Sequence, residues 1–369
     1  MNKRLTFAEY VSPGHPDKVA DIISQYILDR YIEVDPGVRY AIEVMIKGNC
    51  ITLSGEIFST KKRFNNIEYK NYVRQALEEI GYTHKYFIEW GDENAIDPWN
   101  IEVNTNGISS QSGEIAVGVN KDTWGDQGVF YGYADKNGDD YRMPKAHSLA
   151  KSLCRHLYEQ AKNNGIGGLD IKTEIIMDGD SIIKIIAAVP CRLEQEYDDV
   201  KKSIYEWFGP VSEMKDYPEV ILNGTGIYTC HGPIADCGVT GRKLAVDFYG
   251  GGYGIGGGAA IKDSTKADVS LNLYARDLAL SRSYAYNRSV KTSLACCIGS
   301  RTVDFCVEDM ETGEVLDSGS QELKPSDLKR WYKLDKPIYT SMHTFGLFGE
   351  FQQDKEWEKR ASGLKSNDE

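Results

Sequence analysis

Glycine and cationic residues gather in one stretch of this sequence, residues 236–268, which reads DCGVTGRKLAVDFYGGGYGIGGGAAIKDSTKAD. Seven of the nine residues from 250 to 258 are glycine, and such a composition lets backbone N–H groups come close to a ligand. The cations that flank these glycines are Arg242, Lys243, Lys262 and Lys266. Because the whole chain carries a formal net charge of −12, cations that recur beside this loop indicate a polyphosphate-binding site.

Other interpretations of the glycine loop compete with this one. A Walker loop requires a glycine directly before the lysine, and the stretch AAIKDS lacks it. GYGIGG satisfies the dinucleotide pattern G-x-G-x-x-G after KLAVDF, which we expect to be a strand, so a dinucleotide-binding fold is an alternative. Against it, the next helix is expected about eight residues too late, and Asp277, at the acidic position, falls inside that helix. A flexible loop between solvated faces is the third interpretation.

A second group of reactive residue types opens the segment SPGHPDKVADIISQYILD, residues 12–29. Its apolar residues follow the spacing of a buried helix face. Pro16 suits a first helical turn, and Asp17 suits the positive end of the helix dipole, so one interpretation is a well-capped helix start. The other is a site that binds an anion through His15 and Lys18 and a metal through Asp17.

Three further carboxylates are candidate site residues because of their sequence surroundings. Glu43 in IEVM and Glu56 in SGEIF lie among strand hydrophobes, where a carboxylate needs a cationic or metal partner unless it faces solvent. Asp126 in TWGDQGVFYGYA follows a glycine in a predicted turn. It is either a hydrogen-bonding turn residue or a contact for a ligand or cation.

Composition limits the class of protein. The 369 residues predict two or three domains, and the pI near 5.1 argues against nucleic acid or an anionic membrane as the main partner. The sequence contains neither a signal-peptide pattern nor an apolar run of membrane-spanning length, which predicts a cytoplasmic protein. Eight cysteines without a CxxC pair, and scattered histidines, predict reduced thiols and no zinc cage.

The same order of elements, a helix, a β-hairpin and a second helix, is predicted three times along the chain. The expected helices, hairpins and helices are 16–32, 38–58 and 66–81; 145–163, 171–189 and 194–209; and 266–285, 291–308 and 326–334. This order predicts an α+β fold in which helices cover one face of each sheet and three similar layers pack around a common axis.

Domain boundaries follow from this repeat. We expect an N-terminal unit over 1–110, a central unit over 111–226 and a C-terminal unit over 227–369 that contains the glycine loop. The stretches 90–125 and 210–235 are rich in Gly, Asn, Pro and Ser, which predicts linkers that carry ligand loops.

Four blocks of this sequence, GHPDKVAD, GDQGVFYGYA, GPIADCGVTGRKLAVDFYGG and GGGAAIKDSTKAD, resemble the signature blocks of S-adenosylmethionine synthetases (methionine adenosyltransferases), in that family's order. The resemblance extends over nearly the whole chain. It implies three α+β units around a pseudo-threefold axis and a homodimer, or dimer of dimers, with active sites between subunits. It also implies that methionine sulfur attacks ATP at C5′ and that the released tripolyphosphate is hydrolysed to pyrophosphate and phosphate.

Residue roles are implied position by position by the same resemblance. His15 would meet the leaving oxygen, and the expected phosphate cations are Lys172, Arg242, Lys243, Lys262 and Lys266. Asp17 and Asp268 would bind Mg²⁺, two ions per site, and Glu43 would bind K⁺. Methionine would be bound by Glu56, Gln111, Asp126, Asp236 and Lys266. ATP would also be contacted by Asp170, Tyr228, Asp236 and Ala259.

Departures from the family pattern indicate a divergent member. They include Pro13 for Glu, Glu114 for Asp, Ile227 for Arg, His231 for Gly and Val269 for Arg. The segment from Gln111 to Asp126 is shortened, and the stretch 86–107 before it is expanded. Two alternatives therefore stay open: a relative that uses another thioether or acts mainly as a tripolyphosphatase, and a non-catalytic, nucleotide-binding regulatory subunit.

Overall fold

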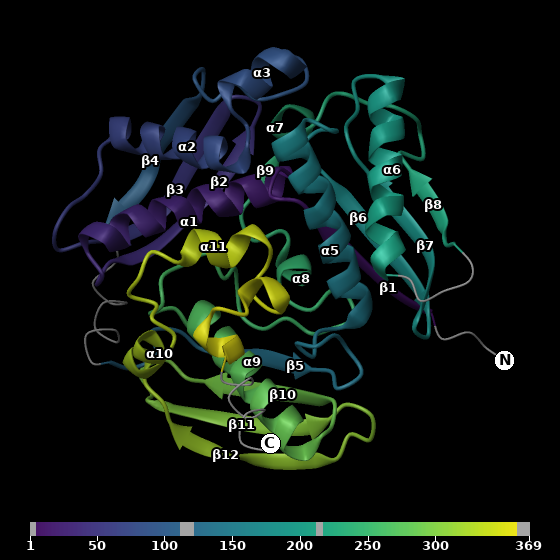
Figure 1. The fold of residues 1–369 in the computed structure, drawn as a ribbon. Helices are drawn as coiled ribbons and strands as arrows, with labels where there is room; N and C mark the ends of the chain where they lie inside the picture. Colours follow the sequence, from purple (N-terminus) through teal and green to yellow (C-terminus); the bar gives the residue numbers. More distant parts are fainter. Residues whose placement is uncertain (1–4, 111–121, 212–216, 360–369) are drawn as a thin grey trace.

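In the part of the chain that the structure describes, three four-stranded sheets with helices packed between and around them make up the fold (Figure 1). The computed structural model describes residues 5–110, 122–211 and 217–359. The sheet orders are β4-β3-β2-β9, β1-β6-β7-β8 and β12-β11-β10-β5. The strands are β1 (Leu5–Val11), β2 (Arg39–Lys47), β3 (Cys50–Phe58), β4 (Glu102–Ser110), β5 (Gly128–Ala134), β6 (Lys172–Asp178), β7 (Ser181–Ala188), β8 (Glu219–Leu222), β9 (Gly238–Val239), β10 (Val290–Cys296), β11 (Thr302–Asp309) and β12 (Val315–Glu322).

The long helices lie against the sheets: α1 and α2 on the first, α5 on the second with α6 beside it, and α9 on the third. Their bounds are α1 (Pro16–Val34), α2 (Asn66–Ile80), α5 (Lys145–Glu159, continued by a π-helical turn over Gln160–Asn164), α6 (Glu194–Val211) and α9 (Ala267–Tyr286). The shorter helices are α3 (His84–Trp90), α7 (Gly232–Ala235), α8 (Leu244–Asp247), α10 (Pro325–Trp331), α11 (Tyr339–Thr344) and a 3₁₀ turn at Glu350–Gln352.

The predicted α+β class and the threefold helix–hairpin–helix order are confirmed. Gly48 and Gly179 adopt φ values of +55° and +60° at the turns of the first two hairpins, a region that glycine enters without strain. At the start of α2, Asn65 and Glu68 form a reciprocal capping box. Local sequence signals of this kind explain why these elements are placed correctly from the sequence.

Two predictions about local structure are wrong. KLAVDF does not form a strand: its central residues form the short helix α8, whose Asp247 is buried in an ion pair with Lys18. The stretches 90–125 and 210–235 are not only loops, because their described residues include β4, β8 and α7. Both strands pair in parallel with the second strand of the preceding hairpin, β3 or β7, since the intervening helices carry the chain back across the sheet.

Each sheet also includes a strand from a distant part of the sequence. β1 pairs with β6, β5 pairs with β10, and β9 pairs with β2, all antiparallel. These three strand pairings hold the layers together, because separation of any layer would break the backbone hydrogen bonds between paired strands. The domain boundaries at 110 and 226 stay a prediction.

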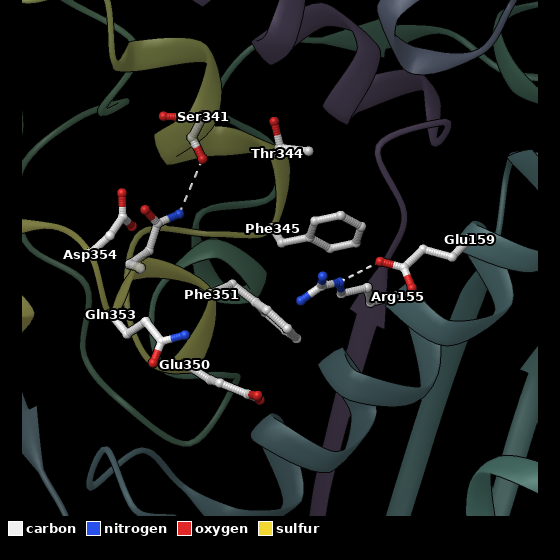
Figure 2. A pocket seen from close by; sticks show the side chains of 10 residues that line it. Arg155, Glu159, Ser341, Thr344, Phe345, Glu350, Phe351, Gln353 and Asp354 are labelled. Carbon is white, nitrogen blue, oxygen red and sulfur yellow. Dashed lines mark hydrogen bonds and ion pairs between the residues drawn. The ribbon is translucent and has the colours of Figure 1, made fainter. Parts of the chain in front are cut away.

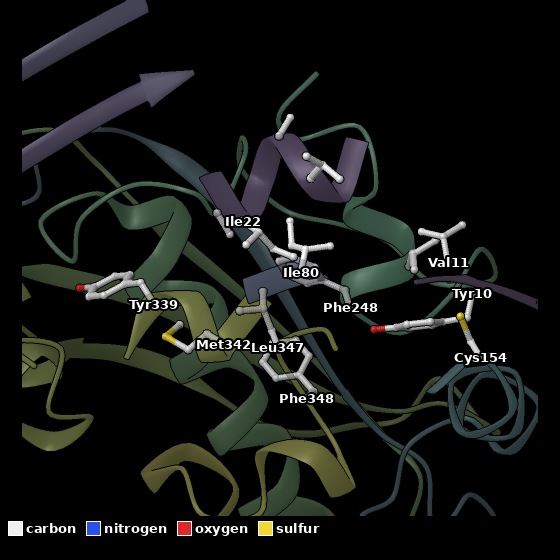
Figure 3. Packing of buried hydrophobic residues seen from close by; sticks show 14 of the residues in the cluster. Tyr10, Val11, Ile22, Ile80, Cys154, Phe248, Tyr339, Met342, Leu347 and Phe348 are labelled. Atoms are coloured by element: carbon white, nitrogen blue, oxygen red, sulfur yellow. The ribbon is translucent and has the colours of Figure 1, made fainter. Parts of the chain in front are cut away.

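One hydrophobic core connects the three layers, and α1 lies inside it. Figure 3 shows buried side chains that several elements contribute to this core, among them Tyr10 of β1, Ile22 of α1 and Phe248. Nearly every residue of α1 is buried, so its polar face is covered as well as its apolar face. The sheets differ from α1: along β2, buried and more exposed residues alternate, so that helices cover one face, as predicted. Among the described residues, no helix combines the length and apolar character needed to cross a bilayer.

Candidate active site

His15 forms the N-cap of α1 and has extended backbone angles (φ −64°, ψ 137°). Its Nδ1 accepts a hydrogen bond from the backbone N–H of Asp17 at 3.2 Å, which assigns the proton of the neutral ring to Nε2. Burial, followed by the nearby Lys243 charge, lowers the pKa of His15 to about 4. At neutral pH this side chain is therefore an uncharged hydrogen-bond donor through Nε2.

Asp17 joins the start of α1 to the segment 239–243. Its Oδ1 accepts from the backbone N–H of Val239 at 2.9 Å, and its Oδ2 accepts from Lys243 Nζ at 2.7 Å. Arg242 Nε lies 3.7 Å from Oδ1. Burial raises the pKa of Asp17, but the hydrogen bonds from Lys243 and Val239 outweigh it, so the pKa lies below its ordinary value. The carboxylate is ionised at neutral pH.

Lys18 does not belong to the open site, so the proposed anion contact through this residue is wrong. Its side chain is 1% exposed, and Nζ lies 2.7 Å from both carboxylate oxygens of Asp247 and 3.4 Å from Asp21. The helix turns by about 100° per residue, which directs Lys18 and Asp21, at i and i+3, to a different side from Asp17. Asp21 in turn accepts from the backbone N–H of Gly241 at 2.8 Å, so this buried group supports the segment that carries Arg242 and Lys243.

Further ionisable side chains lie near His15 and its neighbours: Asp170, Lys172 and Asp236. Lys172 lowers and Asp236 raises the pKa of His15, so both charges lie near the imidazole. Burial raises the pKa of Asp170 to about 7, and its Oδ2 accepts from the backbone N–H of Gly232 at 2.9 Å. Lys172 lies at the start of β6, 51% exposed, where it pairs with Glu9 at 2.6 Å. Burial and the charge of Asp170 raise the pKa of Tyr228, which places this ring near the same group.

The residues brought together in this way form what we call the His15 cluster. Its members are His15, Asp17, Asp170, Lys172, Tyr228, Asp236, Arg242 and Lys243. Two of its cations, Arg242 and Lys172, have side chains 55% and 51% exposed, so the cluster is open to solvent on the isolated chain. Such an arrangement can bind a polyanion and donate a hydrogen bond to it.

A second group, which we call the Asp268 cluster, joins the glycine loop to the first turn of α9. Asp268 is 5% exposed; Oδ2 pairs with Lys262 Nζ at 2.7 Å and Oδ1 accepts from the backbone N–H of Gly258, also at 2.7 Å. A Cβ on Gly257, which has φ +75°, would lie 2.6 Å from Asp268 Oδ1. The loop therefore needs glycine to close around this carboxylate. A Cβ on Gly241 would lie 2.7 Å from the Cβ of Ala259, so the 241–243 segment reaches the end of the loop.

Two further predicted residues, Glu43 and Asp126, lie close to these clusters: Glu43 contacts the residue before the 241–243 segment, and the charges of Asp126 and Asp268 both act on Cys296. Glu43 on β2 accepts a hydrogen bond from Thr240 Oγ1, and Asp126 accepts from the backbone N–H of Gln127. In the described part of the chain, no hydrogen bond or ion pair links the side chain of Glu56 or of Lys266 to either cluster. Gln111 lies outside the described residues, as does Glu114.

Sequence reasoning missed the buried residues that support the site. Asp21 and Asp247 were not identified, although a charged residue inside the apolar run LAVDFY is a signal that was available. Tyr82 was also missed; its hydroxyl donates to the carbonyl of Gly14, directly before His15. Among the departures from the family pattern, Val269 and His231 are each 1% exposed, whereas Ile227 is 36% exposed.

Metal binding by one chain is limited by the donor set. No group of three or more His, Cys, Asp or Glu side chains that would hold a metal ion occurs among the described residues. Asp17 and Asp268 are single carboxylates, each next to a lysine. This fits Mg²⁺, which proteins often bind through one or two carboxylates together with phosphate oxygens and water.

An open pocket of about 430 Å³ lies elsewhere, between α5 and the C-terminal segment (Figure 2). Figure 2 shows Arg155 directed between Phe345 and Phe351, with its guanidinium 4.4 Å from the ring centre of Phe351 and its Nε bonded to Glu159. No residue of the His15 or Asp268 cluster lines this pocket. Charge and hydrogen bonding, rather than a deep cavity, therefore identify the candidate site.

Comparison with known proteins places the chain in a family. The family models for the N-terminal and C-terminal domains of S-adenosylmethionine synthetase match residues 3–98 and 230–359. The S-adenosylmethionine synthase of Clostridium tetani is 32% identical over 96% of this chain and 97% of its own, and that of Zymomonas mobilis 33% over 93% and 92%. A solved structure, described as an unusual S-adenosylmethionine synthetase from Campylobacter jejuni, has a TM-score of 0.87 at 30% identity and covers 98% of both chains. This chain belongs to the S-adenosylmethionine synthetase family.

Proposed function

We propose that this protein is a methionine adenosyltransferase that joins ATP and methionine into S-adenosylmethionine and releases tripolyphosphate, which it hydrolyses to pyrophosphate and phosphate. The observation that carries this proposal is the His15 cluster, in which a neutral imidazole lies among the Arg242, Lys243 and Lys172 cations. The relatives named as S-adenosylmethionine synthases support the same activity.

The reaction requires that the methionine sulfur and C5′ of ATP be aligned and that the charge of the departing polyphosphate be stabilised. A thioether sulfur is nucleophilic without a general base, so the rate depends on alignment and on stabilising the departing polyanion. In this proposal the Nε2–H of His15 donates to the oxygen that leaves C5′. Arg242, Lys243 and Lys172 bind the phosphates from one side, and Lys262 and Lys266 bind them from the glycine loop.

Magnesium would be held by Asp17 and Asp268, with two ions per site. Bound Mg²⁺ neutralises phosphate charge. Lys243 pairs with Asp17 and Lys262 pairs with Asp268, each at 2.7 Å. In this proposal each lysine also contacts a phosphate oxygen of the bound ATP. Glu43, an exposed carboxylate bonded to Thr240, is the residue that we assign to K⁺.

For the remaining substrate contacts, we assign Asp170, Tyr228, Asp236 and Ala259 to ATP. The residues assigned to methionine are Glu56, Gln111, Asp126, Asp236 and Lys266. Among the described residues, the side chains of Glu56 and Lys266 form no hydrogen bond or ion pair with the His15 cluster, and we propose that a second subunit completes the site.

The assembly that we propose is a homodimer, or a dimer of dimers, with the active site between subunits. Exposed apolar side chains on the sheets support it: Phe7 on β1, Met45 on β2 and Phe58 on β3 are 60%, 49% and 44% exposed. We place the enzyme in the cytoplasm, where its eight free cysteines would stay reduced.

Incubation of the protein with ATP, methionine, Mg²⁺ and K⁺ is expected to yield S-adenosylmethionine, pyrophosphate and phosphate in equal amounts. Product analysis by mass spectrometry and phosphate release checks this result. Bound ATP without any product would contradict the proposal, and phosphate release without S-adenosylmethionine would favour the tripolyphosphatase alternative. The regulatory-subunit alternative is not favoured, because the His15 cluster retains its cations and its imidazole.

An Asp17→Asn variant is expected to raise the Mg²⁺ concentration needed for half-maximal activity by about tenfold, because the amide keeps the shape but loses the charge that binds a hard cation. Activity measured over a Mg²⁺ titration checks this expectation. Asp180→Asn, which changes a side chain 89% exposed on a hairpin turn, is the matched control and should leave the titration unchanged. Identical titrations for both variants would remove Asp17 from the metal site.

A further inference from the structure

His231 and the stretch 86–107, both of which the sequence analysis expects to depart from the family pattern, contact each other. His231 lies before α7 and is 1% exposed, and Tyr86 and Trp90 belong to α3. The ring centres of His231 and Trp90 are 4.6 Å apart in an edge-on arrangement. The backbone N–H of His231 also donates to the carbonyl of Asn94, at 3.2 Å, within the same expanded stretch.

The hydrogen bonds of His231 fix its protonation and its orientation. Nδ1 lies 2.7 Å from the carbonyl of Thr229, which accepts only, so Nδ1 carries the proton. Nε2 therefore accepts the hydroxyl proton of Tyr86 at 2.6 Å. The Tyr86 oxygen in turn accepts from the backbone N–H of Leu169 at 3.0 Å. All three groups are thus satisfied in one buried chain that runs from Thr229 to Leu169.

Tyr82, between α2 and α3, extends this chain to the start of α1. Its hydroxyl donates to the carbonyl of Gly14 at 2.7 Å, and its ring stacks on His231 at 6.3 Å between centres. A Cβ on Gly232 would lie only 2.3 Å from the Tyr82 oxygen, so the packing at this point is tight. Gly14, Leu169 and Thr229 each lie next to a residue of the His15 cluster: His15, Asp170 and Tyr228.

We propose that Tyr86 and His231 are positioning residues that hold the ATP-binding segments around Asp170 and Tyr228 in register with His15. The inference rests on the proposed function, since it presumes that these segments bind ATP. His231 fills space that a glycine would leave empty, and Tyr86 supplies the hydroxyl that His231 and Leu169 need. The stretch 86–107, through Tyr86 and Trp90, therefore holds the side chain at position 231 in place.

The test measures ATP affinity separately from methionine affinity. Tyr86→Phe leaves the buried Leu169 N–H and His231 Nε2 without partners, so KM for ATP is expected to rise about tenfold while KM for methionine stays within about twofold. His231→Ala should give a similar rise. Because both residues act through one hydrogen bond, the double variant should resemble the single variants instead of multiplying their effects. Hydrogen exchange in the peptide that contains residues 228–232 should be faster in all three variants.

Tyr69→Phe is the matched control, because it also removes a buried tyrosine hydroxyl, one that bonds to Tyr31 at 2.8 Å between α2 and α1. It should lower stability without changing KM for ATP. The inference is overturned if Tyr86→Phe behaves as Tyr69→Phe does, if both KM values rise equally, or if the double variant shows the product of the single effects. Should the unmodified protein form no S-adenosylmethionine, the proposed function fails, and affinity for a non-hydrolysable ATP analogue still tests the positioning role.

Discussion

Replacement of His15 by alanine is expected to lower kcat by about a hundred- to a thousandfold, the loss typical of a single preorganised donor to developing negative charge. The ring is neutral with its proton on Nε2, because Nδ1 accepts from Asp17 and because burial and Lys243 lower its pKa to about 4. Alanine removes this donor while the cations remain, so KM for ATP should change much less than kcat.

The His15 experiment must separate chemistry from helix capping, because the same side chain caps α1. Asparagine is a good N-cap, so His15→Asn keeps the cap but alters the donor. We expect both variants to be slow in steady-state assays, and His15→Asn to unfold at a higher temperature than His15→Ala. His84→Ala, a change at a histidine 51% exposed on α3, is the control and should retain kcat. Full activity in His15→Asn would contradict a specific requirement for the Nε2–H of the imidazole as the hydrogen-bond donor.

Replacement of Lys18 by methionine is expected to lower the free energy of unfolding by about 3–5 kcal/mol, the range found when one partner of a buried ion pair is removed. Lys18 is 1% exposed and neutralises Asp247 and Asp21, which are also buried. Without the ammonium group, these carboxylates keep the cost of burial and lose the charge that offsets it. Burial already raises the pKa of Asp21 to about 7, which shows how strongly this environment disfavours a charge.

Urea unfolding at a fixed protein concentration measures this effect, and the concentration must be constant because association adds to apparent stability. Lys85→Met, at an exposed lysine paired with Glu89 on α3, should unfold like the unmodified protein. A double variant, Lys18→Met with Asp247→Leu, should recover part of the lost stability, since it removes two of the opposed charges together. Equal unfolding curves for Lys18→Met and Lys85→Met would contradict the buried-pair argument.

Much of the fold was predictable because the signals are local. The apolar spacing over 16–32 and the glycine turns at 48 and 179 act within a few residues, and they place the helices and hairpins correctly. The strands β4, β8 and β9 were not predictable in this way. β8 and β9 are short and β4 is polar, so their sequences carry no clear strand signal. These strands form because the edge of a neighbouring strand offers hydrogen-bond partners.

The candidate site, like the fold, was predictable from the sequence only in part. Residue types indicated His15, Asp17 and the cations near the glycine loop, and the structure brings His15, Asp17, Arg242 and Lys243 together. The role of Lys18 was misjudged, since its neighbours in sequence are site residues whereas its neighbours in space are Asp247 and Asp21. A helix separates adjacent side chains by direction, and only packing decides which direction is open.

The sequence by itself determined the family resemblance, the α+β class and the three hairpins, and it predicted a cationic, glycine-rich polyphosphate site. Only the tertiary structure decided which charges are buried in pairs, which segments support the His15 cluster, and that His231 and Tyr86 share one hydrogen bond. The physical reason is the sequence distance over which each interaction acts. Turn, cap and periodicity signals act over a few residues, whereas burial and hydrogen bonding join groups far apart in the chain, such as Lys18 and Asp247.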